Sequence, residues 1–459
     1  MVRALLAICR QTIRTSVRHR VFHLLLVLVL LAIFLLPLTV NGDGTAAGEM
    51  QITLSYALGI ITTLISAATL WIGCSSISRE VEGYQMHLVL TTSTPRWVAW
   101  VGKWLGIFLL QAVLFGIGAA VIFGMVQWKV AHWQYSPEET ARVRQEVLVG
   151  RRELFPEQPR FRDAVEDEYQ RRLGAGLLDP AHNPAVVKGE LLRQLKARST
   201  EVPPGDTRFW QFPGVKVPAP DASLHLRYRF YAGSTSRSDQ RFAEGLWVFK
   251  DPQGGPDSFS VLPQRVMSGG FHEITVPAAL VAPDGVLSVA YANQDKSGNS
   301  IIFQTADGPS LLVPATGFLA NYLRAVLLVL LQLAVLAAIG CTVSALFSTP
   351  VALFVAIAYL VIGFSVQSAL GVPVQDELEG YKYRTVMEKV THVVAIVTSK
   401  VVVSVSDLDP SSDLTRGRLV TGARLGWACF TLIGLRTLPL AALGIWIFGR
   451  RELGLVIRE

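Results

Sequence analysis

The residues best suited to specific binding lie in a charged hairpin, residues 78–103, between two apolar segments. Its acidic groups can pair with a basic partner surface and steer the approach of that partner. A simple connector between membrane helices does not need such groups, so we predict a docking surface. The residues that we assign to this docking surface are Glu80, Glu82, Gly83, Pro95, Arg96 and Lys103. The alternative is that these charges only mark the membrane boundary.

Residue patterns that support catalysis or metal binding are missing from the sequence. The chain has no phosphate-binding loop, no nucleophile elbow and no zinc-protease motif. The run from Asn293 to Gln304 resembles part of a calcium loop, but glutamine stands where that loop needs a bidentate glutamate, so we predict a plain turn. The four cysteines lack metal-binding spacing. We therefore expect no enzyme activity, no metal and no cofactor in this chain.

Composition and apolar segments place the chain in a membrane. Hydrophobic residues make up 51% and charged residues only 17% of its 459 residues, whereas soluble proteins carry about 25% charged residues. A membrane-spanning helix needs about 20 mostly apolar residues. Segments of this kind cover residues 21–40, 52–74, 105–126, 319–347, 351–370 and 425–448. The sequence therefore predicts an α-helical polytopic membrane protein with six transmembrane helices.

The distribution of charge predicts the orientation of these helices. Five arginines and no acidic residue precede the first span, whereas the following loop, residues 41–50, carries only acidic charges. Positive charges favour the cytoplasmic side, so we place both termini and the charged hairpin in the cytoplasm. The long polar stretch 128–317 and the segment 371–424 then lie outside. We expect a multi-pass protein of a bacterial inner (plasma) membrane.

The arginines before the first span recur at helical spacing, at Arg3, Arg10, Arg14 and Arg18. Apolar residues such as Ile13 fall on another side of the same helix. This pattern predicts an amphipathic helix that lies on the inner face of the membrane. The alternative is a loose basic arm that serves only as a topology signal.

The segment between the third and fourth spans, residues 129–317, changes its period along its length. Apolar residues are four apart within 137–198, at Phe161, Val165 and Tyr169 for example, which predicts helices. Within 206–313, apolar and polar residues alternate in several short runs separated by turn residues. We therefore predict an inserted α+β periplasmic domain that contains a β-sandwich. The polar side chains of the run 224–231 are expected to form a solvated outer face, and the alternative is that they contact a ligand.

Arg436 is the unusual residue within the membrane, midway along the sixth predicted span. An arginine at the bilayer centre costs roughly 2.5–3.5 kcal/mol on insertion scales. It therefore needs a partner or a wet cavity. We favour a pairing with a neighbouring helix and keep a place on a membrane transport path as the alternative.

The order of these features resembles the ABC-2 type permeases, the membrane subunits of ATP-binding-cassette exporters. The likeness is carried by the arginine-bearing first helix, by the charged hairpin with its Thr94-Pro95-Arg96 run, and by the closing run from Phe448 to Gly454. It covers about residues 1–128 and 318–459. The insert 129–317 departs from the simplest members, in which the third and fourth spans are joined briefly.

The resemblance implies a permease subunit that forms a homo- or heterodimer and binds a separate cytoplasmic ABC ATPase. In that family the hairpin between spans two and three carries a coupling helix that sits in a cleft of the ATPase. Glu80 and Glu82 would then meet basic groups there, and Lys103 would anchor the third span. Membrane lipid is expected as a further partner, and nucleic acid is not. The alternative function is a membrane-anchored protein whose periplasmic sandwich recognises an envelope component without translocation.

Overall fold

The chain forms two compact units. The computed structural model describes residues 1–18, 22–24, 26–29, 31, 44–83, 94–133, 135–157, 161–178, 183–219, 222–233, 242–252, 258–295, 298–304, 308–371 and 410–451. The helical unit holds Met1–Gly150 and the described chain from Thr316 onward, and the inserted unit holds Arg151–Ala315. The two units are described separately below.

Four helices of the described chain are long and apolar enough to cross a membrane. They are α3 (Ala46–Ser76) continued by α4 (Ser78–Glu82), α6 (Arg96–His132), α10 (Phe318–Ser344), and the run of α14 (Gly422–Cys429), η4 (Phe430–Thr437) and α15 (Leu438–Arg450). These helices confirm the predicted second, third, fourth and sixth spans. The chain is therefore a multi-pass membrane protein with a mostly helical architecture.

The other two predicted spans have different outcomes. The fifth coincides with α11 (Thr349–Gly371), whose described apolar part, Thr349–Gly363, is not among these four candidate spans. The first, residues 21–40, lies mostly outside the described residues, which include only 22–24, 26–29 and 31 of it. Other helices in the described part of the helical unit are α1 (Val2–Arg18), α7 (Pro137–Glu146) and α13 (Ser411–Thr415).

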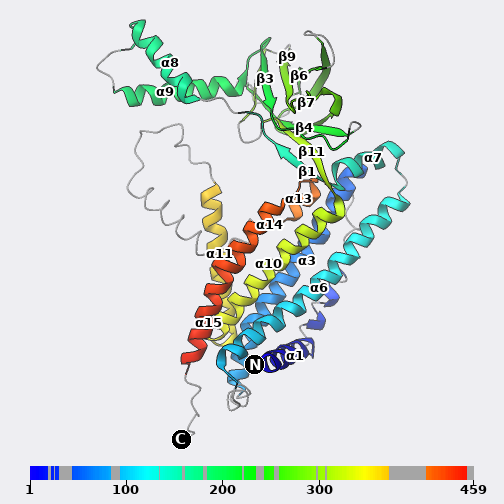
Figure 1. Ribbon diagram of the computed structural model, residues 1–459, viewed down its shortest axis with the longest axis vertical. Coiled ribbons are helices and arrows are strands. Elements are labelled where there is room, and N and C mark those ends of the chain that lie inside the picture. Colours follow the sequence, from blue (N-terminus) through cyan, green and yellow to red (C-terminus); the bar gives the residue numbers. More distant parts are fainter. Residues whose placement is uncertain are drawn as a thin grey trace. The chain divides into compact units, whose positions relative to one another are not determined.

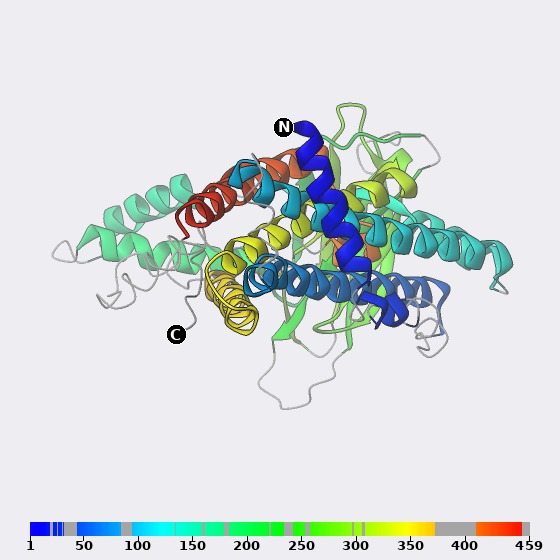
Figure 2. The ribbon, with the colours of Figure 1, turned by 90° about the horizontal axis from the view of Figure 1, so that it is seen from below.

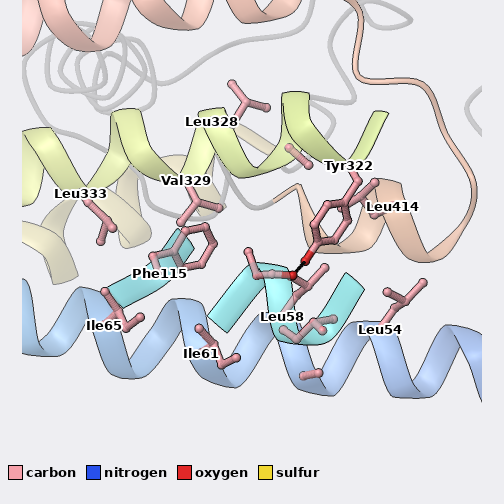
Figure 3. Packing of buried hydrophobic residues seen from close by; sticks show 14 of the residues in the cluster. Leu54, Leu58, Ile61, Ile65, Phe115, Tyr322, Leu328, Val329, Leu333 and Leu414 are labelled. Carbon is pink, nitrogen blue, oxygen red and sulfur yellow. Dashed lines mark hydrogen bonds between the residues drawn. The ribbon is translucent and has the colours of Figure 1, made fainter. Parts of the chain in front are cut away.

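Helices α3, α6 and α10 pack around a common apolar core, shown in Figure 3. Ile61 and Ile65 of α3 face Phe115 of α6 and Val329 of α10 there. The Tyr322 hydroxyl donates to the carbonyl of Ala119 over 2.7 Å, which satisfies a polar group inside this core. Helices α3, α6, α10 and α15 lie side by side in Figure 1.

Small residues allow the closest helix contacts in this unit. A Cβ on Gly340 of α10 would lie 2.8 Å from the Cα of Gly73 on α3, so neither position accepts a side chain without a shift of the backbone. In membranes such close approach favours helix association through backbone packing. The crossing of α3 and α10 is therefore fixed near the end of α3 that leads into the charged hairpin.

Helix α1 has the predicted amphipathic form. Its arginines at positions 3, 10, 14 and 18 are exposed, whereas Ile8 and Thr12 are buried. A Cβ on Gly106 of α6 would lie 2.8 Å from the Cβ of Thr12. Figure 2 shows α1, in dark blue, lying across α6. Glycine on α6 thus lets α1 seat against the helical bundle, and the loose-arm alternative is wrong.

An antiparallel β region between the third and fourth predicted spans is confirmed. The inserted unit contains the helices α8 (Phe161–Gly174) and α9 (Pro184–Thr200) and a short 3-10 helix, η1 (Ala278–Leu280). Its strands are β1 (Val149–Leu154), β2 (Glu201–Val202), β3 (Thr207–Phe212), β4 (Ser223–Arg229), β5 (Tyr231–Gly233), β6 (Phe242–Lys250), β7 (Phe259–Met267), β8 (Phe271–Pro277), β9 (Leu287–Asn293), β10 (Ser300–Ile302) and β11 (Ser310–Gly317). They form sheets with the orders β1-β11-β4-β8, β2-β10-β5 and β3-β9-β6-β7.

Aromatic residues from all three sheets share one core in the inserted unit. Trp247 of β6 packs against Tyr228 of β4 at 4.7 Å between ring centroids and against Phe303, just after β10, at 5.9 Å. Such pairs stabilise a fold beyond their buried area. Strand β1 lies within the segment 137–198, which was predicted as helical. Its sheet neighbour β11 is distant in sequence, so no local period indicates this pairing.

Candidate functional site

The charged hairpin begins where α3 ends, and a serine from another helix holds this point in place. Ser344, at the end of α10, accepts hydrogen bonds from the backbone N–H groups of Ile77 and Ser78 at 3.0 and 2.9 Å. The Ser78 hydroxyl lies 2.8 Å from the hydroxyl of Thr349 at the start of α11. Buried backbone N–H groups need such partners, so the break between α3 and α4 is a defined feature. Helix α4 is thereby tied to α10 and α11.

A buried ion pair joins α4 to the start of α6. The Lys103 ammonium lies 2.6 Å from the Glu80 carboxylate, and the side chains are only 5% and 13% exposed. Lys103 also donates to the carbonyl of Ser76, the last residue of α3, over 3.3 Å. Each charge offsets the desolvation of the other, so removing one partner of such a pair typically costs about 3–5 kcal/mol. This pair locks the two limbs of the hairpin together at its base.

The ion pair changes the role that the sequence suggests for Glu80. Its carboxylate is occupied inside the protein by Lys103, whereas Glu82 and Gly83 are exposed. Among the described residues of the hairpin, Glu82 is therefore the carboxylate that faces outward for a partner. The expected anchoring of the third span by Lys103 fits this geometry. Residues 84–93, between these limbs, lie outside the described residues.

The second limb of the hairpin is tied to the end of α15. Pro95 precedes α6 in an extended conformation and starts the helix at Arg96. One guanidinium nitrogen of Arg96 donates to the carbonyls of Phe448, Gly449 and Arg451 at 3.3, 2.6 and 3.2 Å. These carbonyls close α15, where a cation is favoured by the helix dipole. Arg451 in turn donates to the carbonyl of Ala345, just after α10, over 2.7 Å.

Arg436 lies apart from these hairpin contacts. It is half-buried in η4, a π-helical segment in which the Thr437 hydroxyl donates to the carbonyl of Leu432 over 2.8 Å. Segments of π-helix inside α-helices are often found at functional positions. The structure brings Glu80, Arg96 and Lys103 to one end of the bundle and places Arg436 within the last long helix. Ser344 and Arg451, which complete the hairpin's anchorage, were missed, because a serine or arginine at a helix end carries no sequence signal for a distant partner.

The inserted unit contains a second polar cluster, and here one expectation is wrong. His225 and Arg227 of β4 were expected on a solvated face, but they are only 2% and 6% exposed. Arg151 of β1, itself buried, lies 3.0 Å from Glu273 of β8. Burial, with a smaller effect of the Arg151 charge, lowers the pKa of His225 to about 4. Alternation along β4 misled the prediction because both faces of this strand are covered.

The suspected calcium loop is a turn. The backbone N–H of Asp295 donates to the Asn293 side chain over 3.0 Å, and the Asn299 amide donates to the Asp295 carboxylate over 2.8 Å. Gly298, which lies between Asp295 and Asn299 in the sequence, has a φ of +73°, a conformation that suits glycine. The side-chain oxygens are thus used within the connection between β9 and β10. In the described chain, no group of three or more His, Cys, Asp or Glu residues could hold a metal ion.

No protein-family model matches this chain, and no curated protein sequence is significantly similar to it. Arguments about its function therefore start from the geometry of the charged hairpin.

Proposed function

We propose that this chain is the permease subunit of an ABC-2 type transporter, which forms a membrane path for export or extrusion powered by a separate ATPase. The observation that supports this proposal most strongly is the anchorage of the charged hairpin. Ser344 ties its first limb to α10, the Lys103–Glu80 pair ties that limb to α6, and Arg96 ties the second limb to α15. A loop that only connected α3 and α6 would not need contacts to two further helices, α10 and α15.

Rigid anchorage is what mechanical coupling requires. In the proposed mechanism an ATPase binds the exposed side of α4, where the Glu82 carboxylate enters a basic cleft of the ATPase. Movement of α4 then passes to α6 through the buried ion pair and to α10 through Ser344. A flexible loop would absorb the same movement without transmitting it. The ATPase can change the state of the membrane helices only if its contacts with α4 differ between the two states.

The proposal includes the finer architecture expected from the sequence. The chain spans a bacterial inner membrane six times with both termini in the cytoplasm, and its inserted unit is a periplasmic module with a β-sandwich. A second permease, identical or different, completes the path. Arg436 serves first as a paired residue within the bundle and, in the alternative, lines that path. The chain itself hydrolyses no ATP.

Co-purification tests the proposal. The tagged chain is isolated from its native membrane in mild detergent, and the eluate is assayed for ATP hydrolysis and for a nucleotide-binding protein. Glu82→Lys should remove that partner, because it reverses the charge that faces the cleft. Glu138→Lys on α7 is the matched control, since Glu138 is also exposed but lies outside the hairpin. Glu80 is left intact, because its replacement would break a buried ion pair.

Two results would contradict the proposal. The first is a chain that carries no ATPase under any mild condition. The second is equal recovery of the ATPase with Glu82→Lys and Glu138→Lys. An envelope component that co-purifies in place of an ATPase would support the anchored recognition protein instead.

A further inference from the structure

A polar cavity of about 250 Å³ lies beside the charged hairpin. Its walls include Ser16 and Thr12 from α1, Phe22 from the segment 22–24, Ser75 and Arg79 from the α3–α4 run, and Lys103 from α6. Hydroxyl and charged groups therefore line part of this space, and the apolar side chains of Phe22, Trp71 and Ile72 line the rest. No step of the proposed coupling mechanism uses the cavity, although it shares the Lys103–Glu80 pair as part of its wall.

An apolar cavity adjoins the polar one. It is lined mainly by aliphatic residues of α3 and α6, such as Leu64, Ala68 and Leu114, and by Leu26. Phe22 and Ile72 line both cavities, so the two spaces are neighbours. The two cavities are here called the amphiphilic groove, which has polar groups beside the hairpin and is apolar farther along α3.

The length of the amphiphilic groove matches one leaflet of a bilayer. Its lining extends along the α3–α4 run from Leu64 to Glu80, sixteen residues apart, which corresponds to about 24 Å of helix. A bilayer with its headgroups is about 40–45 Å thick, so one leaflet takes up roughly half of this. The polar end lies at the boundary where α1 carries exposed arginines, and the apolar end lies within the predicted bilayer.

The charges at the polar end favour an anion. Lys103 is balanced by its ion pair with Glu80, so Arg79 supplies the net positive charge of the lining. Arginine and hydroxyl groups suit a phosphate, because hydrogen bonds to an ionised acceptor are roughly twice as strong as neutral ones. An isolated phosphate would leave the apolar cavity unused. A molecule with a phosphate at one end and an alkyl chain at the other uses the whole groove.

We infer that the amphiphilic groove binds one anionic phospholipid of the leaflet beside the hairpin. Its phosphate lies beside Ser16 and Arg79, and the first methylene groups of one acyl chain pass Ile72 into the apolar cavity, whose volume is about 70 Å³. The bound lipid fills the space between α1 and the base of the hairpin. This inference goes beyond the transporter proposal, and it holds equally for a membrane-anchored protein, because it requires only that the chain is embedded in a bilayer.

Gln111 provides a way to identify the occupant. It is 1% exposed and lines the apolar cavity, and neither its side-chain nitrogen nor its side-chain oxygen has a hydrogen-bond partner among the described residues. An acyl chain offers this amide nothing, so Gln111→Leu should leave phospholipid binding unchanged or strengthen it. A ligand with a polar group deep in the groove would instead lose affinity in this variant.

The test uses the full chain, purified in detergent, stripped of lipid and titrated with phosphatidylglycerol while bound lipid is followed by native mass spectrometry. Ile72→Trp should weaken binding about tenfold, or about 1.4 kcal/mol, because it fills the junction of the two cavities. The matched control is Val113→Trp, on an α6 position that is 60% exposed and outside both cavities.

Two variants that each introduce a negative charge test the polar end independently, in case Ile72→Trp impairs folding. Ser16→Glu should weaken binding of phosphatidylglycerol, whereas Gln11→Glu, on an exposed position of α1 outside the cavity, should not. Inorganic phosphate in excess should fail to displace the lipid. The inference is overturned by equal affinity in each variant and its control, by displacement with inorganic phosphate, or by a loss of affinity in Gln111→Leu.

Discussion

Each unit of this protein contains a buried ion pair, and the two pairs differ in their surroundings. Lys103 and Glu80 of the helical unit are 5% and 13% exposed. Arg151 of the inserted unit is 2% exposed, but its partner Glu273 is 31% exposed and the pair lies near His225. The first pair is almost closed to solvent and balanced in charge, whereas the second opens to solvent on its acidic side. The Lys103–Glu80 pair therefore holds two helices together. In the second pair, the positive charge of Arg151 is less fully balanced, so its surroundings in the sheet are cationic.

The largest effect is expected when the closed pair is broken. Lys103→Met leaves the Glu80 carboxylate buried without its partner, which should destabilise the protein by about 3–5 kcal/mol. Thermal unfolding of the detergent-purified protein, followed by size-exclusion chromatography, measures the change. Lys129→Met is the matched control: the Lys129–Glu49 pair, also 2.6 Å long, is 16% and 26% exposed and should lose less.

A double variant sharpens this result. Replacement of both members of a buried pair by apolar residues is often neutral. Lys103→Met combined with Glu80→Leu should therefore recover most of the stability that Lys103→Met loses. A double variant as unstable as the single one would show that the two charges do not act as a pair.

The next effect concerns acidic pH and the inserted unit. The pKa of His225 is about 4 in the folded chain, against about 6.5 for an unperturbed histidine. As the pH falls, His225 is therefore protonated in the unfolded chain before it is protonated in the folded chain. The free energy of unfolding is highest above about pH 6.5 and declines towards pH 4, by about 3 kcal/mol in total. Unfolding midpoints measured across this range should fall for the native chain and fall less for His225→Gln. Parallel curves would contradict this account of His225.

The smallest effect is expected at the open pair. Glu273→Gln removes the charge that faces Arg151, but solvent reaches this side and water can replace the carboxylate. Loss of a hydrogen bond to a charged group costs about 1.5–3 kcal/mol at most, and solvent exposure reduces this further. Unfolding at neutral pH should thus show a smaller loss than Lys103→Met. A larger loss would show that the Arg151–Glu273 pair contributes more to stability than the Lys103–Glu80 pair, which contradicts the comparison.

The parts of this structure that follow from local pattern could be predicted from sequence. Hydropathy identifies the long helices, and the spacing of Arg10, Arg14 and Arg18 identifies α1, because both signals repeat within one or two helical turns. Alternation likewise identifies the β region. The role of Lys103 as an anchor of the third span was expected only from the family resemblance, and it stays a prediction.

The parts that depend on distant contacts could not be predicted. Ser344 reaches Ser78 across 266 residues, and Arg96 reaches Gly449 across 353 residues. Nothing in the local sequence specifies such partners. The same limit explains β4: His225 and Arg227 alternate with apolar residues as they would on a solvated face, and only the tertiary structure covers them. Glu80 illustrates the consequence, because its role depends on whether Lys103 lies within reach.

The most direct test of the transporter proposal is photo-crosslinking from position 82 in living cells, which identifies the proteins that contact this position. A photo-reactive benzoyl-phenylalanine is introduced at Glu82, and the same group is placed at Glu138 of α7 as the control. The account predicts one adduct that is specific to position 82 and contains a cytoplasmic nucleotide-binding protein with ATPase activity. An adduct with an envelope protein, or no protein adduct at position 82 in a chain that reaches the membrane intact, would contradict it.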